Sequence, residues 1–250
     1  MEKMIPHKIK PMVSICKERK LISLADSFIP QKRDGILGNK ISAVVITKNE
    51  GANIKECLES LNFTDEIIIV DDFSSDNTVR IAGKYTKKIY NRRWDNYASQ
   101  KNFGILKAKN RWVLSIDADE RISKALKSEI KSCKFKKDGY LIPIKNYFLG
   151  KWLKYGEQYP DYHLRLFKKS KGKFELKILE VHEGVHLKSK NTGNLRSPIL
   201  HYSFNNIVSY FDKFNKYTHL DALGRFKNNK KPSFYGLFLR PVFRFIKWYF

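Results

Sequence analysis

Cysteines, acidic residues and long apolar runs are all scarce in this sequence. Three of its 250 residues are cysteines, and Cys16, Cys57 and Cys133 form no C-x-x-C pair and have no histidine close by. This argues against a disulfide framework and a cysteine-bound structural zinc, and it fits a reducing cytosol. No apolar run reaches the roughly 18 residues of a membrane span, and the basic N-terminus lacks the apolar segment of a signal peptide. We therefore expect neither feature.

Basic residues greatly outnumber acidic ones. The chain has 49 lysines and arginines against 25 aspartates and glutamates, which gives a formal net charge of +24. An anionic partner is expected, and nucleic acid, a phospholipid surface, lipopolysaccharide and nucleotide phosphates all fit. A hydrophobic content of 42% argues against global disorder, and the length allows one large domain with appendages.

Short apolar strands alternate with amphipathic helices in the first half of the chain. Because this alternation is typical of βαβ units, we predict an α/β fold with a mostly parallel sheet flanked by helices. The expected strands are 42–46, 66–70, 88–90 and 111–116, and the expected helices are 53–61, 97–109 and one capped by Asp76 that runs to about Tyr85. Beyond Ala125 we expect strands at 139–144, 162–167, 181–185 and 199–202. An aromatic stretch, NYFLGKWLKYGEQYPD, separates the first two of these.

Polar residues follow three of the predicted parallel strands, as TKNE, DDFSSD and DADE. Ligands bind at the carboxyl ends of strands in such sheets, so these segments are expected to form the rim of one site. In an extended chain Asp117 and Asp119 point the same way and so would address one cation, such as Mg²⁺ with substrate phosphates completing its shell. Alternatively, Asp119 only caps the next helix.

The segment His182–His186, HEGVH, matches the letters of the H-E-x-x-H zinc-protease motif. That motif needs a helix, whereas Gly184 lies in its middle and the flanking residues alternate as in a strand. We therefore do not expect a zinc site here.

Four blocks, VVITKNEGANIKECLESL, EIIIVDDFSSDNT, KNFG and WVLSIDADE, resemble the nucleotide-binding half of family 2 glycosyltransferases with the GT-A (Rossmann-like) fold. The later segments YPDYHLRLFKK, VHEGV and HYSF resemble the lipopolysaccharide-core β-glucosyltransferase subgroup. The resemblance implies a basic N-terminal extension at 1–39, a glycosyltransferase domain at 40–203 and C-terminal helices at 204–250. The domain would divide into a nucleotide half, 40–125, and an acceptor half, 126–203.

The resemblance also implies roles for individual residues. Mg²⁺ or Mn²⁺ would be held by Asp117 and Asp119 and bridge the donor diphosphate. The positions that match the family's nucleotide-sugar contacts are Thr47, Asn49, Glu50, Asp71, Asp72, Lys101 and Asp117. Two alternatives stay open: Asp71 and Asp72 form only a turn, and Lys101 is a solvated helix lysine.

Family 2 enzymes invert the anomeric carbon by direct displacement, so one base must take the proton of the attacking hydroxyl. The candidates are Asp161, in YPDYHLRLF, and Glu183, in VHEGV. Arg165 either binds phosphate or forms a salt bridge in the core.

These features predict an inverting, metal-dependent glycosyltransferase that moves a sugar from a nucleotide-sugar, with UDP favoured by the resemblance, to an envelope glycan or glycolipid such as lipopolysaccharide core. The alternative is a basic, non-catalytic module on the same scaffold that binds nucleic acid or anionic lipid. Carboxylates gathered at three strand ends favour the enzyme, and no nucleic-acid-binding motif is present.

The C-terminal segment is rich in aromatic residues and carries no acidic ones. Arg240, Arg244 and Lys247 fall on one face of a helix that is expected to start near Pro241, with apolar residues around the rest. Such a helix is typical of one lying in the headgroup region of a membrane, which predicts a cytoplasmic protein at the inner-membrane surface. The alternative is a terminal helix docked on the domain. In the preceding helix, Ile207, Phe211, Phe214 and Thr218 share one face.

Overall fold

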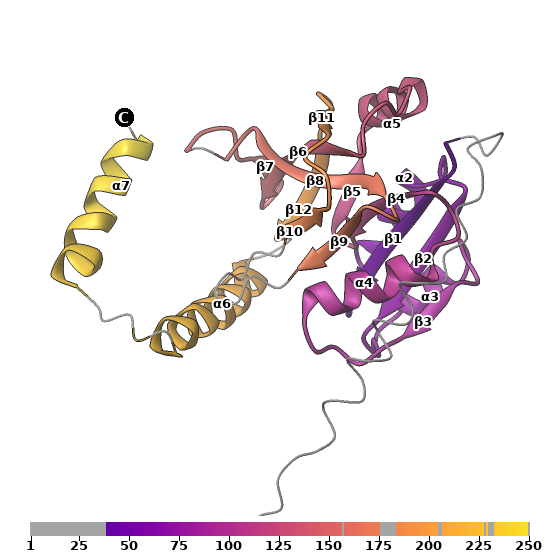
Figure 1. Ribbon diagram of the computed structural model, residues 1–250. Coiled ribbons are helices and arrows are strands. Elements are labelled where there is room, and N and C mark those ends of the chain that lie inside the picture. Colours follow the sequence, from indigo (N-terminus) through magenta and orange to yellow (C-terminus); the bar gives the residue numbers. More distant parts are fainter. Residues whose placement is uncertain are drawn as a thin grey trace, which may run out of the picture. The chain divides into compact units, whose positions relative to one another are not determined.

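The structure is a computed structural model that describes residues 39–156, 158–175, 184–204, 207–227, 229 and 233–249 (Figure 1). The predicted N-terminal extension and Glu183 lie outside the described residues. The described chain is a mixed α/β fold whose main sheet has the strand order β3-β2-β1-β4-β8-β6-β12-β5.

The first half of the chain forms the parallel part of this sheet. Its strands are β1 (Ile41–Thr47), β2 (Glu66–Asp71), β3 (Ile89–Asn91) and β4 (Trp112–Asp117), connected by the helices α2 (Ile54–Ser60), α3 (Thr78–Ala82) and α4 (Tyr97–Lys107). The prediction for this half is confirmed, except at α3. Asn77 and not Asp76 is the residue before that helix, which ends at Ala82 and not near Tyr85. The Asp76 carboxylate still accepts the N–H of Thr78, the first helical residue, and that of Gly51, both at 2.9 Å.

Both faces of the parallel strands are buried, and alternate residues enter different cores. Ala43 and Val45 of β1 pack in the core that contains the apolar residues of α2, whereas Val44 packs in the core of α4. Gly104 of α4 lies so close to β1 that an added Cβ would overlap the side chain of Val44. Helix α4 therefore packs closely on the sheet, and Lys101 of this helix contacts Asp117 at the carboxyl end of β4.

The second half continues the sheet with mixed strand directions. Its elements are β5 (Glu120–Ile122), α5 (Lys124–Ser132), β6 (Gly139–Phe148), β7 (Lys151–Trp152), β8 (Asp161–Lys168), β11 (Thr192–Asn194) and β12 (Ile199–Phe204). Strand β8 runs antiparallel between β4 and β6, and β12 runs parallel to β6 and antiparallel to β5. Strands β9 (Gly172–Glu175) and β10 (Gly184–Leu187) form a separate hairpin beside α4. The described part of the HEGVH segment, from Gly184 on, belongs to β10.

Three helical segments end the chain: α6 (Ile207–Lys227), the π-helix η1 (Tyr235–Leu239) and α7 (Arg240–Tyr249). The helix predicted near Pro241 is therefore present. None of the described helices is long and apolar enough to cross a membrane. The apolar side chains of α7 are largely exposed, for example Phe243 at 58% and Phe245 at 62%, as is Phe211 of α6 at 53%.

Candidate functional site

The carboxyl ends of β1, β2 and β4 lie side by side, as the sequence predicts. Thr47 pairs in register with Asp71 on β2, and its neighbour Ile46 pairs with Asp117 on β4. The three polar segments therefore meet at one edge of the sheet. Side chains from α4, β8 and β12 reach the same edge and complete the candidate site.

The loops after β1 and β2 are joined by hydrogen bonds. The Asn49 N–H donates to the Ser74 hydroxyl, and the Asn49 side-chain oxygen accepts the Ser75 N–H, both at 2.8 Å. The Glu50 N–H donates to the Thr78 hydroxyl at 2.8 Å. Asn49 and Glu50 thus hold the rim of the site in one shape.

The two aspartates after β2 have different environments. Asp71 is buried, and its two carboxylate oxygens accept the N–H and the hydroxyl of Ser74 at 2.8 and 2.5 Å, so it shapes the turn. Asp72 is more exposed; it accepts the Trp94 N–H at 2.9 Å and lies 3.6 Å from the Lys48 ammonium. Thr47 is buried, and its hydroxyl has no hydrogen-bond partner among the described residues. A ligand at this edge would supply one.

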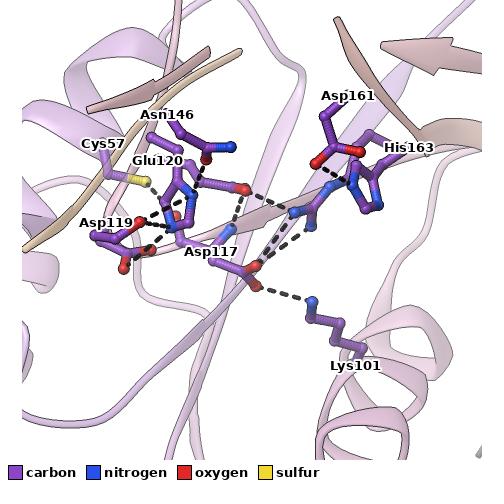
Figure 2. A network of polar contacts seen from close by, with 11 residues as sticks. Cys57, Lys101, Asp117, Asp119, Glu120, Asn146, Asp161 and His163 are labelled. Carbon is purple, nitrogen blue, oxygen red and sulfur yellow. Dashed lines mark hydrogen bonds and ion pairs between the residues drawn. The ribbon is translucent and has the colours of Figure 1, made fainter. Parts of the chain in front are cut away.

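Asp117 lies between two cations that come from different halves of the chain (Figure 2). The ammonium of Lys101, on α4, is 2.9 Å from one carboxylate oxygen, and the guanidinium of Arg165, on β8, is 3.4 Å from the other. Lys101 is only 4% exposed, so it is not a solvated lysine. Burial alone would raise the pKa of Asp117, but the charges of Lys101 and Arg165 outweigh it and hold this pKa well below its usual range.

Glu120 is buried and contacts both Asp117 and Arg165. It is 1% exposed, accepts the Asp117 N–H at 2.8 Å and contacts the Arg165 guanidinium at 2.6 Å. Burial, together with the charge of Asp117, raises its pKa despite Arg165. The Arg165 guanidinium therefore forms buried ion pairs with Asp117 and Glu120, and phosphate binding by Arg165 stays a prediction.

A β-bulge aims Arg165 at these carboxylates. On β6, the consecutive residues Tyr140 and Leu141 pair with Leu166 and Leu164, so Arg165 is the extra residue between them on β8. Bulges bend a strand and redirect a side chain, and they are frequent next to active sites. Here the extra residue reaches the carboxyl end of β4.

Asp119 does not share the surroundings of Asp117. The chain turns at Ala118 and Asp119, so the extended geometry that we assumed for this pair is absent. The carboxylate of Asp119 lies 3.5 Å from the Nε2 atom of His201, whose Nδ1 atom is 2.8 Å from the Asn146 side-chain oxygen. Burial lowers the pKa of His201, but the hydrogen bond and the charge of Asp119 outweigh it and raise this pKa above its ordinary value.

The remaining candidates are the two proposed bases. Asp161, at the start of β8, is partly exposed and lies 2.9 Å from the Nε2 atom of His163. It lies on the same strand as Arg165, four residues earlier, which is about 13 Å along a strand. The structure does not place Glu183.

Comparisons with known proteins identify the family. Residues 42–190, more than half of the chain, match the family described as glycosyl transferase family 2. The chain belongs to this family. The transferase is 32% identical over 219 residues to the lipopolysaccharide core biosynthesis glycosyltransferase LpsC of Rhizobium meliloti, covering 84% of this chain and 80% of LpsC. It is 34% identical to an uncharacterized glycosyltransferase of Rickettsia bellii, covering 86% of this chain and 77% of that one.

Among solved structures, S. aureus TarS 1–349 in complex with UDP is similar, with a TM-score of 0.48 and 18% identity. The match covers 74% of the transferase and 65% of that chain.

Two residues of the transferase site were not predicted as functional. Glu120 belongs to the DADE segment, and its contact with Arg165 depends on the bulge in β8. His201 follows the apolar residues Ile199 and Leu200 in β12. A histidine directly after a predicted apolar pair is a weak signal, and only the pairing of β12 with β5 places His201 opposite Glu120.

Proposed function

We propose that this family 2 glycosyltransferase moves a sugar with inversion from a nucleotide-sugar to a lipopolysaccharide-core glycan or glycolipid. The observation that carries the proposal is the set of carboxylates and cations at the carboxyl ends of β1, β2 and β4. The name of LpsC, 32% identical over most of the chain, supports the acceptor class. UDP is the nucleotide that the family resemblance favours.

The charges of the site support a bound metal ion. Three carboxyl groups, Asp117, Asp119 and Glu120, face Lys101, Arg165 and His201. These basic groups already contact carboxylates, so the negative charge of a diphosphate needs a further cation. No three His, Cys, Asp or Glu side chains in the described part of the chain are grouped to hold a metal alone. This fits Mg²⁺ or Mn²⁺, which is commonly held by one or two carboxylates together with substrate phosphates.

We propose that Asp119 and His201 hold this divalent cation, with the donor phosphates completing its shell. When bound, the metal would neutralise charge that develops on the departing diphosphate. Lys101 and Arg165 fix the Asp117 carboxylate, and Thr47 and Asp72 offer hydrogen bonds to the nucleoside. Asn49, Glu50 and Asp71 act through the shape of the rim.

The proposed base is Asp161 or Glu183. Asp161 has the support of its position on β8, beside His163 and four residues from Arg165. A carboxylate here would take the proton of the acceptor hydroxyl as the bond to the anomeric carbon forms.

The test is donor hydrolysis and UDP binding with and without Mn²⁺. Asp119→Asn is expected to abolish metal-dependent UDP binding and turnover and to leave the unfolding temperature nearly unchanged. Asp212→Asn, at an exposed position of α6, is the control and should behave as wild type. Near-normal turnover of Asp119→Asn at saturating Mn²⁺ would refute the metal assignment, and preference for GDP over UDP would refute the nucleotide.

We further propose that α7 attaches the transferase to the cytoplasmic face of the inner membrane. Arg240, Arg244 and Lys247 are exposed at i, i+4 and i+7, and the apolar side chains between them are exposed as well. Each cation near an anionic bilayer contributes roughly 1 kcal/mol, so changing all three to glutamine should weaken vesicle binding about 100-fold. The same change at Lys124, Lys127 and Lys131 of α5 is the control. Equal binding by both triple variants would exclude α7 as the contact.

A further inference from the structure

The aromatic stretch between β6 and β8 supplies part of a row of rings and cations across four neighbouring strands. The row consists of Tyr202 on β12, Tyr147 on β6 and Trp152 on β7, and Arg121 on β5 stands at its end. Strands β12, β6 and β7 lie close together in Figure 1, and Tyr147 pairs in register with both Tyr202 and Trp152. These side chains therefore share one face of the sheet.

The contacts within this row are close. The Arg121 guanidinium lies 4.2 Å from the centre of the Tyr202 ring, which stacks on Tyr147 at 4.7 Å with an angle of 11°. The Lys145 ammonium lies 3.9 Å from the centre of the Trp152 ring and 5.5 Å from that of Tyr147. The rings are thus held in place and flanked by positive charge.

The polar groups at the Trp152 end of the row are hydrogen-bond donors. Within the described residues, Lys145 and Lys154 contact aromatic rings and form no ion pair with a carboxylate. The indole N–H of Trp152 is buried and finds no acceptor there. Ammonium and indole groups donate and do not accept, so the complementary ligand group is an acceptor-only anion such as phosphate or carboxylate.

Exposed apolar surface surrounds these donors. Tyr155 is 78% exposed, Leu153 38% and Tyr162 38%. Aromatic side chains combine a flat apolar face with polar edges, which suits a ligand that has both apolar and polar surfaces. A sugar ring has both, and a bare inorganic anion does not.

The row borders the candidate active site. The Tyr202 N–H donates to the Asp119 carbonyl oxygen at 3.0 Å, and Tyr202 directly follows His201. Arg121 directly follows Glu120 and lies 3.7 Å from Glu56. A ligand on the row would therefore lie beside β5 and β12, the strands that carry Glu120 and His201, on the sheet face opposite to the His201 and Asn146 side chains.

We propose that the row of Tyr202, Tyr147 and Trp152, with Lys145 and Lys154, is an acceptor subsite that binds a sugar carrying a phosphate or carboxylate group. This inference rests on the proposed function, because it assigns the chemistry of the acceptor. Lys145, Lys154 and the indole N–H bind the anionic group, and the exposed rings pack on the sugar.

The experiment measures binding of glucose 6-phosphate, glucose and inorganic phosphate by isothermal titration calorimetry, with Mn²⁺ and UDP saturating and about 0.15 M salt. Glucose 6-phosphate is expected to bind at least tenfold more tightly than either other probe. Lys145→Gln should weaken its binding about tenfold or more, and Lys145→Arg should restore most of it. Trp152→Phe, which keeps a ring and removes the N–H, should weaken it by a smaller factor. Lys131→Gln, an exposed lysine of α5, is the control.

The outcomes separate the two proposals. If Lys145→Gln and Trp152→Phe bind glucose 6-phosphate as wild type does, or if phosphate alone binds equally well, the subsite is wrong and the proposed function is untouched. If neither the wild type nor any variant binds UDP in the presence of Mn²⁺, the proposed function is refuted, and the subsite proposal that rests on it falls with it. If Lys145→Gln does not fold, Lys154→Gln at an exposed position serves as the second variant and should also weaken binding. Wild-type binding by that variant would overturn the subsite.

Discussion

Replacing Lys101 by methionine removes the cation that reaches Asp117 from the nucleotide half. The side chain is 4% exposed and its ammonium lies 2.9 Å from the carboxylate. Breaking a buried ion pair costs about 3–5 kcal/mol. Here Arg165 stays 3.4 Å from Asp117, whose side chain is 28% exposed, so we expect a smaller loss of about 2 kcal/mol. For a chain of this size that lowers the unfolding temperature by about 4–8 °C.

The same substitution should also weaken nucleotide binding. A charge-assisted hydrogen bond contributes about 1.5–3 kcal/mol, so the Kd for UDP with Mn²⁺ should rise about 10- to 150-fold. Differential scanning calorimetry measures the first effect and isothermal titration calorimetry the second. Lys107→Met is the matched control, because Lys107 lies on the same helix, is exposed, and contacts only the rings of Tyr90 and Phe103 among the described residues.

A double variant separates stability from binding. The neutral amide that Asp117→Asn introduces needs no cation, so combining this change with Lys101→Met should recover much of the lost stability and none of the UDP affinity. If Lys101→Met leaves both the unfolding temperature and the UDP affinity unchanged, the pairing of Lys101 with Asp117 has no role in solution. If stability falls and UDP affinity does not, Lys101 is structural.

Two further predictions concern the scaffold. Gly104→Ala should lower the free energy of unfolding by about 1–3 kcal/mol, because the new Cβ overlaps the side chain of Val44. Urea denaturation measures this loss. An unchanged midpoint would mean that α4 shifts without a cost in stability. Glu66 is 6% exposed, and although burial raises its pKa, hydrogen bonds from the Lys109 N–H and from Lys88 outweigh this and lower it. Its stabilising contribution is therefore present above its ordinary pKa of 4.5 and is lost as the pH falls below that value. Glu66→Gln should flatten the decline of stability between about pH 6 and pH 3, and a decline as steep as in wild type would contradict this.

The first half of the fold could be predicted because its signals are local. Each buried strand is a short apolar run that ends on a polar residue, and parallel pairing follows from the helices between the strands. The rim at Thr47, Asp71 and Asp117 follows from the same pattern. The hydrogen bonds within this rim do not follow from the sequence pattern, because they depend on how the loops after β1 and β2 pack together.

The second half depends on pairings between distant segments. Nothing in the sequence indicates that β8 lies between β4 and β6, or that its bulge falls at Arg165. A single residue of slip in β8 would turn Arg165 to the other side. The sequence left open whether Lys101 is buried for a related reason: this depends on the close packing of α4 against the sheet at Gly104.

These long-range pairings have one consequence for the chemistry. Lys101 comes from α4 in the first half of the chain and Arg165 from β8 in the second, and both cations meet at the carboxylate of Asp117. Glu120 ties Arg165 to the Asp117 backbone at the same time, so the bulge in β8 cannot move without disturbing the carboxyl end of β4. A diphosphate that draws Lys101 or Arg165 away from Asp117 would thereby act on β8, the strand that carries Asp161. If the proposed roles hold, donor binding would be coupled to the position of Asp161 through these ion pairs and β8.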